Sequence, residues 1–266
     1  MGKKIITQAA FILLVMVNTC WAKGCGKNLA TSQLEKETCP VEAILKQLNE
    51  ETLKLESYQC QIEYHFSQPV LESETLRTGV LYYQKFGKKS KLRINFNTLK
   101  QDDEEEQKYI EHYIFDGVWL TYIDYQIKEV KRYQQAEPNE PVDAFELAKR
   151  NFPIIGFTKV EELKEEFEIK LVEQQGSKSN DFIHLHLKVK PDSTYKDDYT
   201  SIDFWIDKKL YLPAKIVAVS TEEDIYQMKL LKPKVNKRID KKVFEFKIPK
   251  GFGVETIPLK ERKRPK

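Results

Sequence analysis

The chain has 266 residues, of which 41% are hydrophobic and 32% charged, a composition typical of a folded globular protein and not of a disordered one. The formal net charge is only +3, and basic and acidic residues are interspersed along the chain. The sequence therefore lacks the basic stripe of a nucleic-acid-binding protein, and nucleic acid is not an expected partner.

The first 22 residues have the pattern of an export signal. "MGKK" supplies a positive start, "AAFILLVMV" is too short to cross a bilayer comfortably, and Cys20 and Ala22 place small residues where a signal peptidase cuts. We expect residues 1–22 to be removed and the mature protein to lie in the periplasm. Two alternatives stay open: an uncleaved N-terminal anchor, or a lipoprotein signal in which Cys20 becomes the lipidated first residue. Asn18 and Thr19 fit such a lipoprotein signal poorly.

Three cysteines remain if cleavage follows Ala22, namely Cys25, Cys39 and Cys60. An odd number in an oxidising compartment allows at most one disulfide and leaves one thiol over. A Cys39–Cys60 bridge and simple reduced thiols are both compatible with the sequence. A thiol-redox enzyme is not expected, because the chain has no C-x-x-C motif.

The first predicted element after the signal is a helix at residues 40–56, preceded by a polar leader at 23–39. Pro40 suits the first helical turn, where a missing N–H has no consequence. The apolar residues then recur at helical spacing, namely Val41, Ile44, Leu45, Leu48 and Leu55. The sequence therefore predicts one amphipathic helix before the first strand.

From Tyr58 the hydrophobic period changes to two, which predicts β-strands. The expected strands are "YQCQIEYHF", "TLRTGVLYYQKF" and "KLRINFNTL". The acidic run "QDDEEEQK" has the composition of an exposed loop between strands and lacks the ligand alternation of a calcium loop.

Residues 109–133 predict a β-hairpin with an unusual pattern. Asp116-Gly117 separates two apolar runs, which is a strong hairpin signal, and a second turn is expected near Asp124. Both faces of the arms are apolar, however, whereas a sheet with one wet face should alternate. The sequence therefore requires that the second face of this hairpin is covered as well.

The rest of the chain predicts a helix from about Val142 to Phe152, ended or kinked by Pro153, and then mostly strands. "TKVEELKEEFEIKLVEQQ" should begin as a short helix and become a strand at "FEIKLVEQ". The last expected strands are "DFIHLHLKVKP", "TSIDFWIDKKLYLPAKIVAVS", "IYQMKLLKPKVN" and "FEFKIPKG". This order predicts an α+β fold: one strongly curved antiparallel sheet with helices over part of its concave face.

Motifs for catalysis, cofactors or metals do not stand out. The chain contains no G-x-S-x-G, H-E-x-x-H, P-loop or G-x-G-x-x-G sequence, so we expect neither an enzyme nor a cofactor. His184 and His186 would point the same way on a strand and could bind a metal if His112 or Asp203 approached. Polar residues on a solvated strand face are the simpler interpretation, and a binding protein is the favoured class.

The order of several short motifs resembles the periplasmic lipoprotein-carrier family, LolA. The first helix runs into "LKLESYQCQIEYHFSQ", similar to the family's strand ending Phe-Ser/Thr-Gln, and a glycine-led strand starts at Gly79. "FDGVWLTYIDYQIKEVKRY" resembles the family's D-G-K hairpin, "AFELAKRNF" its later helix pair, and "FEFKIPKGFGVE" its closing motif. The resemblance covers about residues 40–256, in the order of the family.

This resemblance implies an incomplete β-barrel of eleven antiparallel strands, with helices that form a movable lid over an apolar cavity. It implies a domain at 40–257 followed by a basic tail at 258–266. The implied function is to shield the acyl chains of lipoproteins between an inner-membrane ABC exporter and an outer-membrane receptor. We expect a monomer. A lipid-anchored receptor or lipid-binding lipoprotein of the same fold, or a periplasmic sensor that binds a partner, remain alternatives.

The expected cavity lining comes from the sheet and from the lid. The sheet should contribute Tyr83, Leu92, Ile94, Phe115, Leu120, Tyr122 and Trp205, and the lid Phe145, Leu147 and Phe152. The family often has Arg-Pro after the second strand, where the arginine holds lid carbonyls, but this chain has Lys85-Phe86. Lys85, or Arg93 in the next strand, is a candidate for that latch, although a lysine lacks the planar fork of an arginine.

Overall fold

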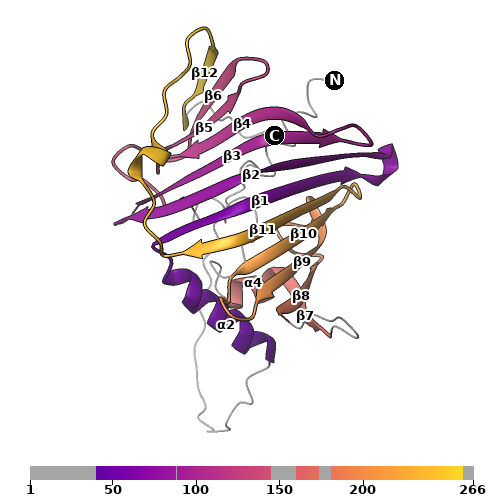
Figure 1. The fold of residues 1–266 in the computed structure, drawn as a ribbon. Helices are drawn as coiled ribbons and strands as arrows, with labels where there is room; N and C mark the ends of the chain where they lie inside the picture. The colour runs from indigo at the N-terminus through magenta and orange to yellow at the C-terminus, as the bar shows by residue number, and fades with distance from the viewer. Residues whose placement is uncertain (1–39, 88, 145–159, 174–180, 260–266) are drawn as a thin grey trace.

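The computed structural model describes residues 40–87, 89–144, 160–173 and 181–259. Within these residues, twelve strands form one sheet in the order β12-β6-β5-β4-β3-β2-β1-β11-β10-β9-β8-β7. The strands are β1 (Ser57–Gln68), β2 (Ser73–Phe86), β3 (Lys89–Gln101), β4 (Gln107–Phe115), β5 (Trp119–Asp124), β6 (Glu129–Gln134), β7 (Phe167–Val172), β8 (Phe182–Val189), β9 (Tyr199–Asp207), β10 (Pro213–Ser220), β11 (Ile225–Val235) and β12 (Gly253–Ile257). Figure 1 shows them side by side in a strongly curved sheet.

The sheet does not close into a barrel, since β12 and β7 form its two edges. Every pairing is antiparallel except that between β12 and β6. The predicted α+β class and incomplete antiparallel β-barrel are therefore confirmed. The family resemblance implies eleven strands, and the additional parallel strand β12 brings the described number to twelve.

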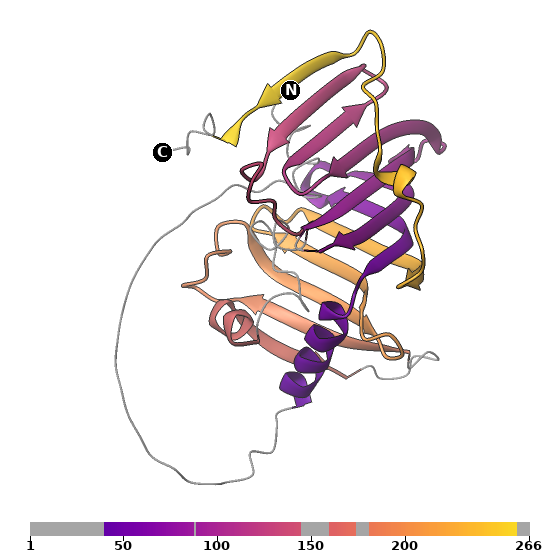
Figure 2. The same cartoon turned by 90° about the vertical axis from the view of Figure 1, so that its left-hand side faces the viewer.

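The two α-helices of the described residues lie at one end of the sheet. The predicted amphipathic helix is α2 (Pro40–Leu53), and the predicted short helix before β7 is α4 (Val160–Glu166). Figure 2 shows both helices at the β7–β10 end. Leu45 and Leu48 of α2 and Leu163 of α4 are buried in the same hydrophobic core as the sheet. No helix in the described part of the chain is long and apolar enough to cross a membrane.

The two faces of the sheet differ in character, as strand β1 illustrates. Ile62, Tyr64 and Phe66 belong to the main hydrophobic core and lie on the concave face, the face that α2 and α4 cover in part. Glu63 and His65 alternate with them on the convex face. Side chains directly opposite one another on neighbouring strands share a face. The inward residues of the other strands can therefore be assigned from those of β1, and most of the core lies on this concave face.

The second face of the aromatic hairpin is covered by the C-terminal segment, residues 238–257. Ile114, Ile123 and Val130 point to the convex face and are buried there, with Phe246 and Phe252 packed against them. The segment crosses the convex side of the sheet and ends in β12, which pairs with β6. The requirement read from the hairpin pattern is therefore met by residues more than a hundred positions away.

The expected final strand at "FEFKIPKG" is wrong. Its first residue, Phe244, ends the 3₁₀ helix η2 (Lys241–Phe244), and the strand of this region is β12, from Gly253. The Phe-x-Phe alternation resembles a strand because both aromatic rings pack. The backbone carbonyls of Val243 and Glu245, however, accept hydrogen bonds from the Arg93 side chain and not from a neighbouring strand.

Gly79 allows β2 and β3 to approach closely at an irregularity in their pairing. A Cβ at this position would lie 2.0 Å from the Asn95 carbonyl oxygen, so no other residue fits without a backbone shift. The register shifts between Thr78 and Gly79, and Phe96 lies opposite the glycine on the concave face. A glycine within a strand often marks such a bend.

Candidate functional site

Six of the expected lining residues lie together on the concave face, in two neighbouring cross-strand rows. One row runs across β1–β5, and its members are Tyr58, Tyr83, Leu92, Phe115 and Leu120. The next row runs across β3–β5, and its members are Ile94, Tyr113 and Tyr122. The structure therefore brings these residues together on one surface, and their part in binding a ligand stays a prediction.

Burial divides these residues into two groups. Tyr83, Ile94, Phe115 and Leu120 are only 1–3% exposed, so they are packed within the chain. The Tyr83 hydroxyl donates to the Asp143 carboxylate at 3.2 Å, and Ser90 accepts a hydrogen bond from the Ala144 N–H, so residues 143–144 are fixed to this end of the concave face.

The half-buried part of the concave face lies nearer the middle of the sheet. Its apolar side chains are Leu81, Leu92, Ile216, Met228 and Leu230. Ile216 lies opposite Met228 on the neighbouring strand, and Met228 lies opposite Tyr64 on β1. Binding of an additional hydrocarbon group to this surface stays a prediction.

Trp205 is the exception among the expected sheet residues, because it lies on the convex face. Its neighbours Phe204 and Ile206 are the ones that enter the concave core. The Trp205 ring stacks on His184 at 4.2 Å, and the Lys215 ammonium lies 4.2 Å from the ring centroid. The sequence "DFWID" is apolar at three successive positions, so hydrophobicity alone does not reveal which residues point inward.

The remaining expected residues fall partly outside the described structure. Phe145, Leu147 and Phe152 of the expected lid lie outside the described residues, as do Cys20, Cys25 and Cys39. Cys60 is a free, buried thiol, and burial raises its pKa to about 12. A thiol with so high a pKa is a poor nucleophile.

The two latch candidates contact different parts of the chain. The Lys85 ammonium lies 3.9 Å from the Glu56 carboxylate, in the link between α2 and β1. Arg93 points to the convex face, where its guanidinium donates to the carbonyls of Val243 at 2.8 Å and Glu245 at 3.1 Å. Its described contacts therefore hold the C-terminal segment. A role of either residue in holding a lid stays a prediction.

A buried polar network that the sequence pattern did not indicate lies on the concave face of β2–β5. The Arg77 Nε donates to the Glu111 carboxylate at 3.0 Å. The Tyr122 hydroxyl bonds to Glu111 at 2.9 Å and to Asp124 at 3.1 Å. The relative exposure of Arg77, Glu111 and Asp124 is only 9%, 4% and 3%. The concave face is therefore apolar in its middle and charged at the end of these strands.

Burial raises the pKa of the Glu111 carboxyl, and the Arg77 charge and the Tyr122 hydrogen bond oppose that shift. Burial acts to lower the pKa of Arg77, but Glu111 and the neighbouring tyrosines together outweigh it and raise this pKa. In "YIEHYIF" Glu111 takes an inward position whose neighbours two residues away on the same face, Tyr109 and Tyr113, are aromatic. An isolated charge at an inward position is the one signal in the sequence that could have revealed the network.

His184, His186 and Asp203 come together on the convex face, on the neighbouring strands β8 and β9. One Asp203 oxygen lies 2.7 Å from His184 Nε2 and 3.0 Å from His186 Nδ1. His112 lies elsewhere, beside Arg93 and Tyr125. Within the described residues, no group of three His, Cys, Asp or Glu side chains has the arrangement of a metal site.

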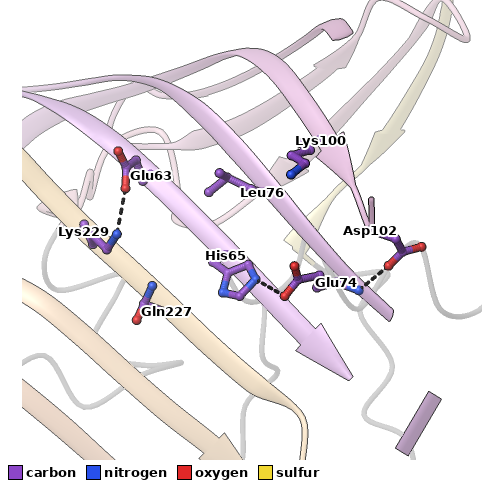
Figure 3. A pocket seen from close by; sticks show the side chains of 8 residues that line it. All are labelled: Glu63, His65, Glu74, Leu76, Lys100, Asp102, Gln227 and Lys229. Atoms are coloured by element: carbon purple, nitrogen blue, oxygen red, sulfur yellow. Dashed lines mark hydrogen bonds and ion pairs between the residues drawn. The ribbon is translucent and has the colours of Figure 1, made fainter. Parts of the chain in front are cut away.

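A shallow pocket of about 210 Å³ on the convex face carries charges of both signs, as Figure 3 shows. The Lys229 ammonium pairs with Glu63 at 3.0 Å, and His65 lies 2.9 Å from Glu74. The Asp102 carboxylate accepts a hydrogen bond from the Glu74 N–H. Because most of these groups already have partners, the pocket offers little to an incoming ligand.

Known proteins resemble this chain in fold only. No protein-family model matches it, and no curated protein does. An uncharacterized conserved protein from Thermus thermophilus is 11% identical over 82% of this chain and 99% of that chain, with a TM-score of 0.46. The MucA/MucB complex from Pseudomonas aeruginosa gives 12% identity over 79% of this chain and 62% of that chain, with a TM-score of 0.45.

A LolA superfamily protein from Nitrosomonas europaea is 13% identical over 77% of this chain and 96% of that chain, with a TM-score of 0.31. At these identities and TM-scores the similarity concerns the fold alone, and no activity is transferred from it.

Proposed function

We propose that this protein is a periplasmic carrier that shields the acyl chains of lipoproteins on its concave face and passes them toward the outer membrane. The observation that carries the proposal is the difference between the two faces of β11. Met228 and Leu230 lie half-buried on the concave face, continuous with the core, whereas Gln227 and Lys229 lie on the convex face. An apolar surface of this kind, enclosed on the inner side of a soluble sheet, suits hydrocarbon tails.

The energetics support acyl chains as the ligand. Each CH₂ group removed from water contributes about 0.8 kcal/mol, so one fatty acyl chain supplies enough binding energy without a specific polar contact. A carrier also has to release its ligand, and modest packing of half-buried side chains favours such exchange. In this proposal an inner-membrane ABC exporter loads the concave face and an outer-membrane receptor unloads it.

A pair of variants in one strand tests the proposal. Met228→Glu places a carboxylate on the half-buried concave surface, and Gln227→Glu places the same group on the convex face one residue away. We expect the first variant to bind a synthetic triacylated lipopeptide at least about tenfold more weakly, since a buried charge costs more than about 1.4 kcal/mol. The second variant should bind like the unchanged protein. Isothermal titration calorimetry measures both affinities.

Equal binding by the two variants, or no binding of the lipopeptide by the unchanged protein, would contradict the proposal. Native mass spectrometry of protein purified from its own periplasm provides an independent test, in which acylated peptides should co-purify. The mass of the mature protein also separates a free carrier from a lipid-anchored protein. Cleavage after Ala22 agrees with the carrier, and a diacylglyceryl group on Cys20 would exclude it.

A further inference from the structure

A second cavity lies at the end of the sheet where β9, β10 and β11 meet, and Tyr58 and Leu230 of the concave face contribute to its wall. Its volume is about 360 Å³. This size falls within the range of small-molecule binding sites, about 300–1,000 Å³. Its walls are mainly apolar, and they include Trp205, Leu212, Leu231 and Pro233.

The cavity exists because β10 and β11 separate at this end. Their pairing runs no further in this direction than Lys215 opposite Lys229, although β11 continues to Val235 alongside β1. Pro213, the first residue of β10, has no N–H with which to extend the pairing. A register shift between Gln59 and Gln61 of β1 bends the partner strand at the same level.

Three lysines line this apolar cavity, Lys215, Lys229 and Lys232. Lys229 pairs with Glu63, but within the described residues no ion pair joins Lys215 or Lys232 to a carboxylate. The one acidic residue of the lining, Asp207, uses its carboxylate to accept the N–H groups of Lys209 and Leu210 in the following turn. The cavity therefore carries an excess of positive charge.

The surroundings of Lys215 destabilise its charged form. Burial lowers the pKa of Lys215 and repulsion by Lys229 lowers it further, while attraction to Asp203 opposes the shift only in part. The Lys215 ammonium lies over the Trp205 ring, which compensates a cation only in part. By contrast, the convex pocket of Figure 3 balances its lysines with Glu63, Glu74 and Asp102.

We propose that this cavity is a separate binding site for a small organic anion: a monocarboxylate with an apolar, aliphatic or aromatic body. The body would lie against Trp205, Leu231 and Pro233, and the carboxylate would meet Lys215 and Lys232. Charge complementarity selects this ligand over a neutral one of the same shape, since hydrogen bonds to charged groups are the stronger ones. The site shares Leu230 with the proposed acyl-chain surface, but its Lys215 lies on the convex face, and the proposal does not depend on acyl-chain binding.

Calorimetric titration of the full mature chain with 4-phenylbutyrate tests this site, with 4-phenylbutan-1-ol as the neutral analogue. We expect one equivalent of the carboxylate to bind, and the alcohol to bind at least about fivefold more weakly. The double variant Lys215→Gln/Lys232→Gln should weaken carboxylate binding about tenfold, as the loss of a charged hydrogen bond predicts. Lys108→Gln, an exposed lysine on β4, is the matched control and should leave binding unchanged.

Equal affinity for the carboxylate and the alcohol, or equal binding by the lysine variants and the control, would overturn the proposal. The variant Met228→Glu separates this site from the concave face. Carboxylate binding that survives Met228→Glu and falls in the lysine variant supports the second site. Carboxylate binding that falls in Met228→Glu and survives in the lysine variant places the ligand on the concave face and overturns it. Neither result depends on whether lipopeptides bind.

Discussion

Strands β2–β6 and strands β7–β11 lie on either side of β1, and they differ in what covers their two faces. In β7–β11 the concave face is apolar and the convex face is mainly polar, with Asp203 and Lys229 among its residues. In β2–β6 the convex face of β4–β6 is also apolar, beneath the C-terminal segment. The concave face of β2–β5 in turn holds the buried pair of Arg77 and Glu111.

The difference shows what simple alternation of residues can and cannot indicate. Where one face is covered by the core and the other faces water, apolar and polar residues alternate, and the strand can be predicted from its own sequence. Where a distant segment covers the second face, both faces are apolar and the alternation of apolar and polar residues disappears. The β2–β6 half is therefore the more dependent on long-range contacts, and three perturbations should expose this dependence.

The largest effect is expected from the buried ion pair of the β2–β6 half. Arg77→Met removes the cation and leaves the Glu111 carboxylate buried without its principal partner. Breaking such a pair on one side costs about 3–5 kcal/mol. Urea denaturation of the full chain should show this loss as a lower transition midpoint.

The matched control is the pair of Lys229 and Glu63, whose nitrogen–oxygen distance is the same 3.0 Å but whose side chains are 40% and 33% exposed. Lys229→Met should cost at most about 1 kcal/mol, because water screens an exposed pair. Adding Glu111→Leu to Arg77→Met should restore part of the lost stability, since no unpaired charge then remains at that position. Similar small losses for Arg77→Met and Lys229→Met would show that the concave network is open to water.

A pH effect of intermediate size is expected on the convex face of the same half. Burial, with repulsion from Arg93, lowers the pKa of His112 to about 4. The unfolded chain therefore binds this proton more tightly than the folded protein does, and stability is complete above the ordinary pKa of about 6.5. It should fall by at most about 3 kcal/mol as the pH decreases from about 6.5 toward 4, given about 1.36 kcal/mol per pKa unit and solvent screening.

The variant His112→Gln tests the origin of this effect, because it removes the titrating ring beside Arg93 and Tyr125. Its unfolding free energy should depend less on pH over that same acidic range than that of the unchanged protein. His65→Gln, which changes a more exposed histidine on β1, should keep the full dependence. An identical pH profile for His112→Gln and the unchanged protein would assign the effect to other groups.

Much of the fold was predictable from the sequence because its signals are local. The period of two in β1 and the helical spacing around Leu45 and Leu48 arise within single elements and predicted them correctly. The misassigned "FEFKIPKG" has a strand-like pattern, but its partner is the side chain of Arg93, 150 residues away in the sequence. Local pattern carries no information on such a partner.

The candidate site was predictable to a smaller extent. Phe115 and Leu120 lie opposite each other on one face, because hairpin register follows from the Asp116-Gly117 turn, and their part in lining a ligand site stays a prediction. Trp205 was placed on the wrong face, since no polar residue marks the alternation at "FWI". The pairing of Arg77 with Glu111 depends on the order of β2, β3 and β4, which only the assembled sheet defines.

The smallest effect is expected where the C-terminal segment covers β4–β6. Phe252 packs half-buried against the cluster of Ile114, Ile123 and Val130, and its ring lies 5.5 Å from Tyr125. Truncation of a fully buried phenylalanine to alanine costs about 3–5 kcal/mol. Because Phe252 is only half-buried, Phe252→Ala should reduce the free energy of unfolding by about 1–2 kcal/mol. Val254→Ala, in the same segment but 51% exposed, should change stability by less than about 0.5 kcal/mol.

Hydrogen exchange locates the loss: amides of β12 and its partner β6 should exchange faster in Phe252→Ala, while those of β8 and β9 keep their protection. Equal acceleration in both halves would mean that the segment stabilises the whole sheet, and the contrast between the two halves would then be one of composition only.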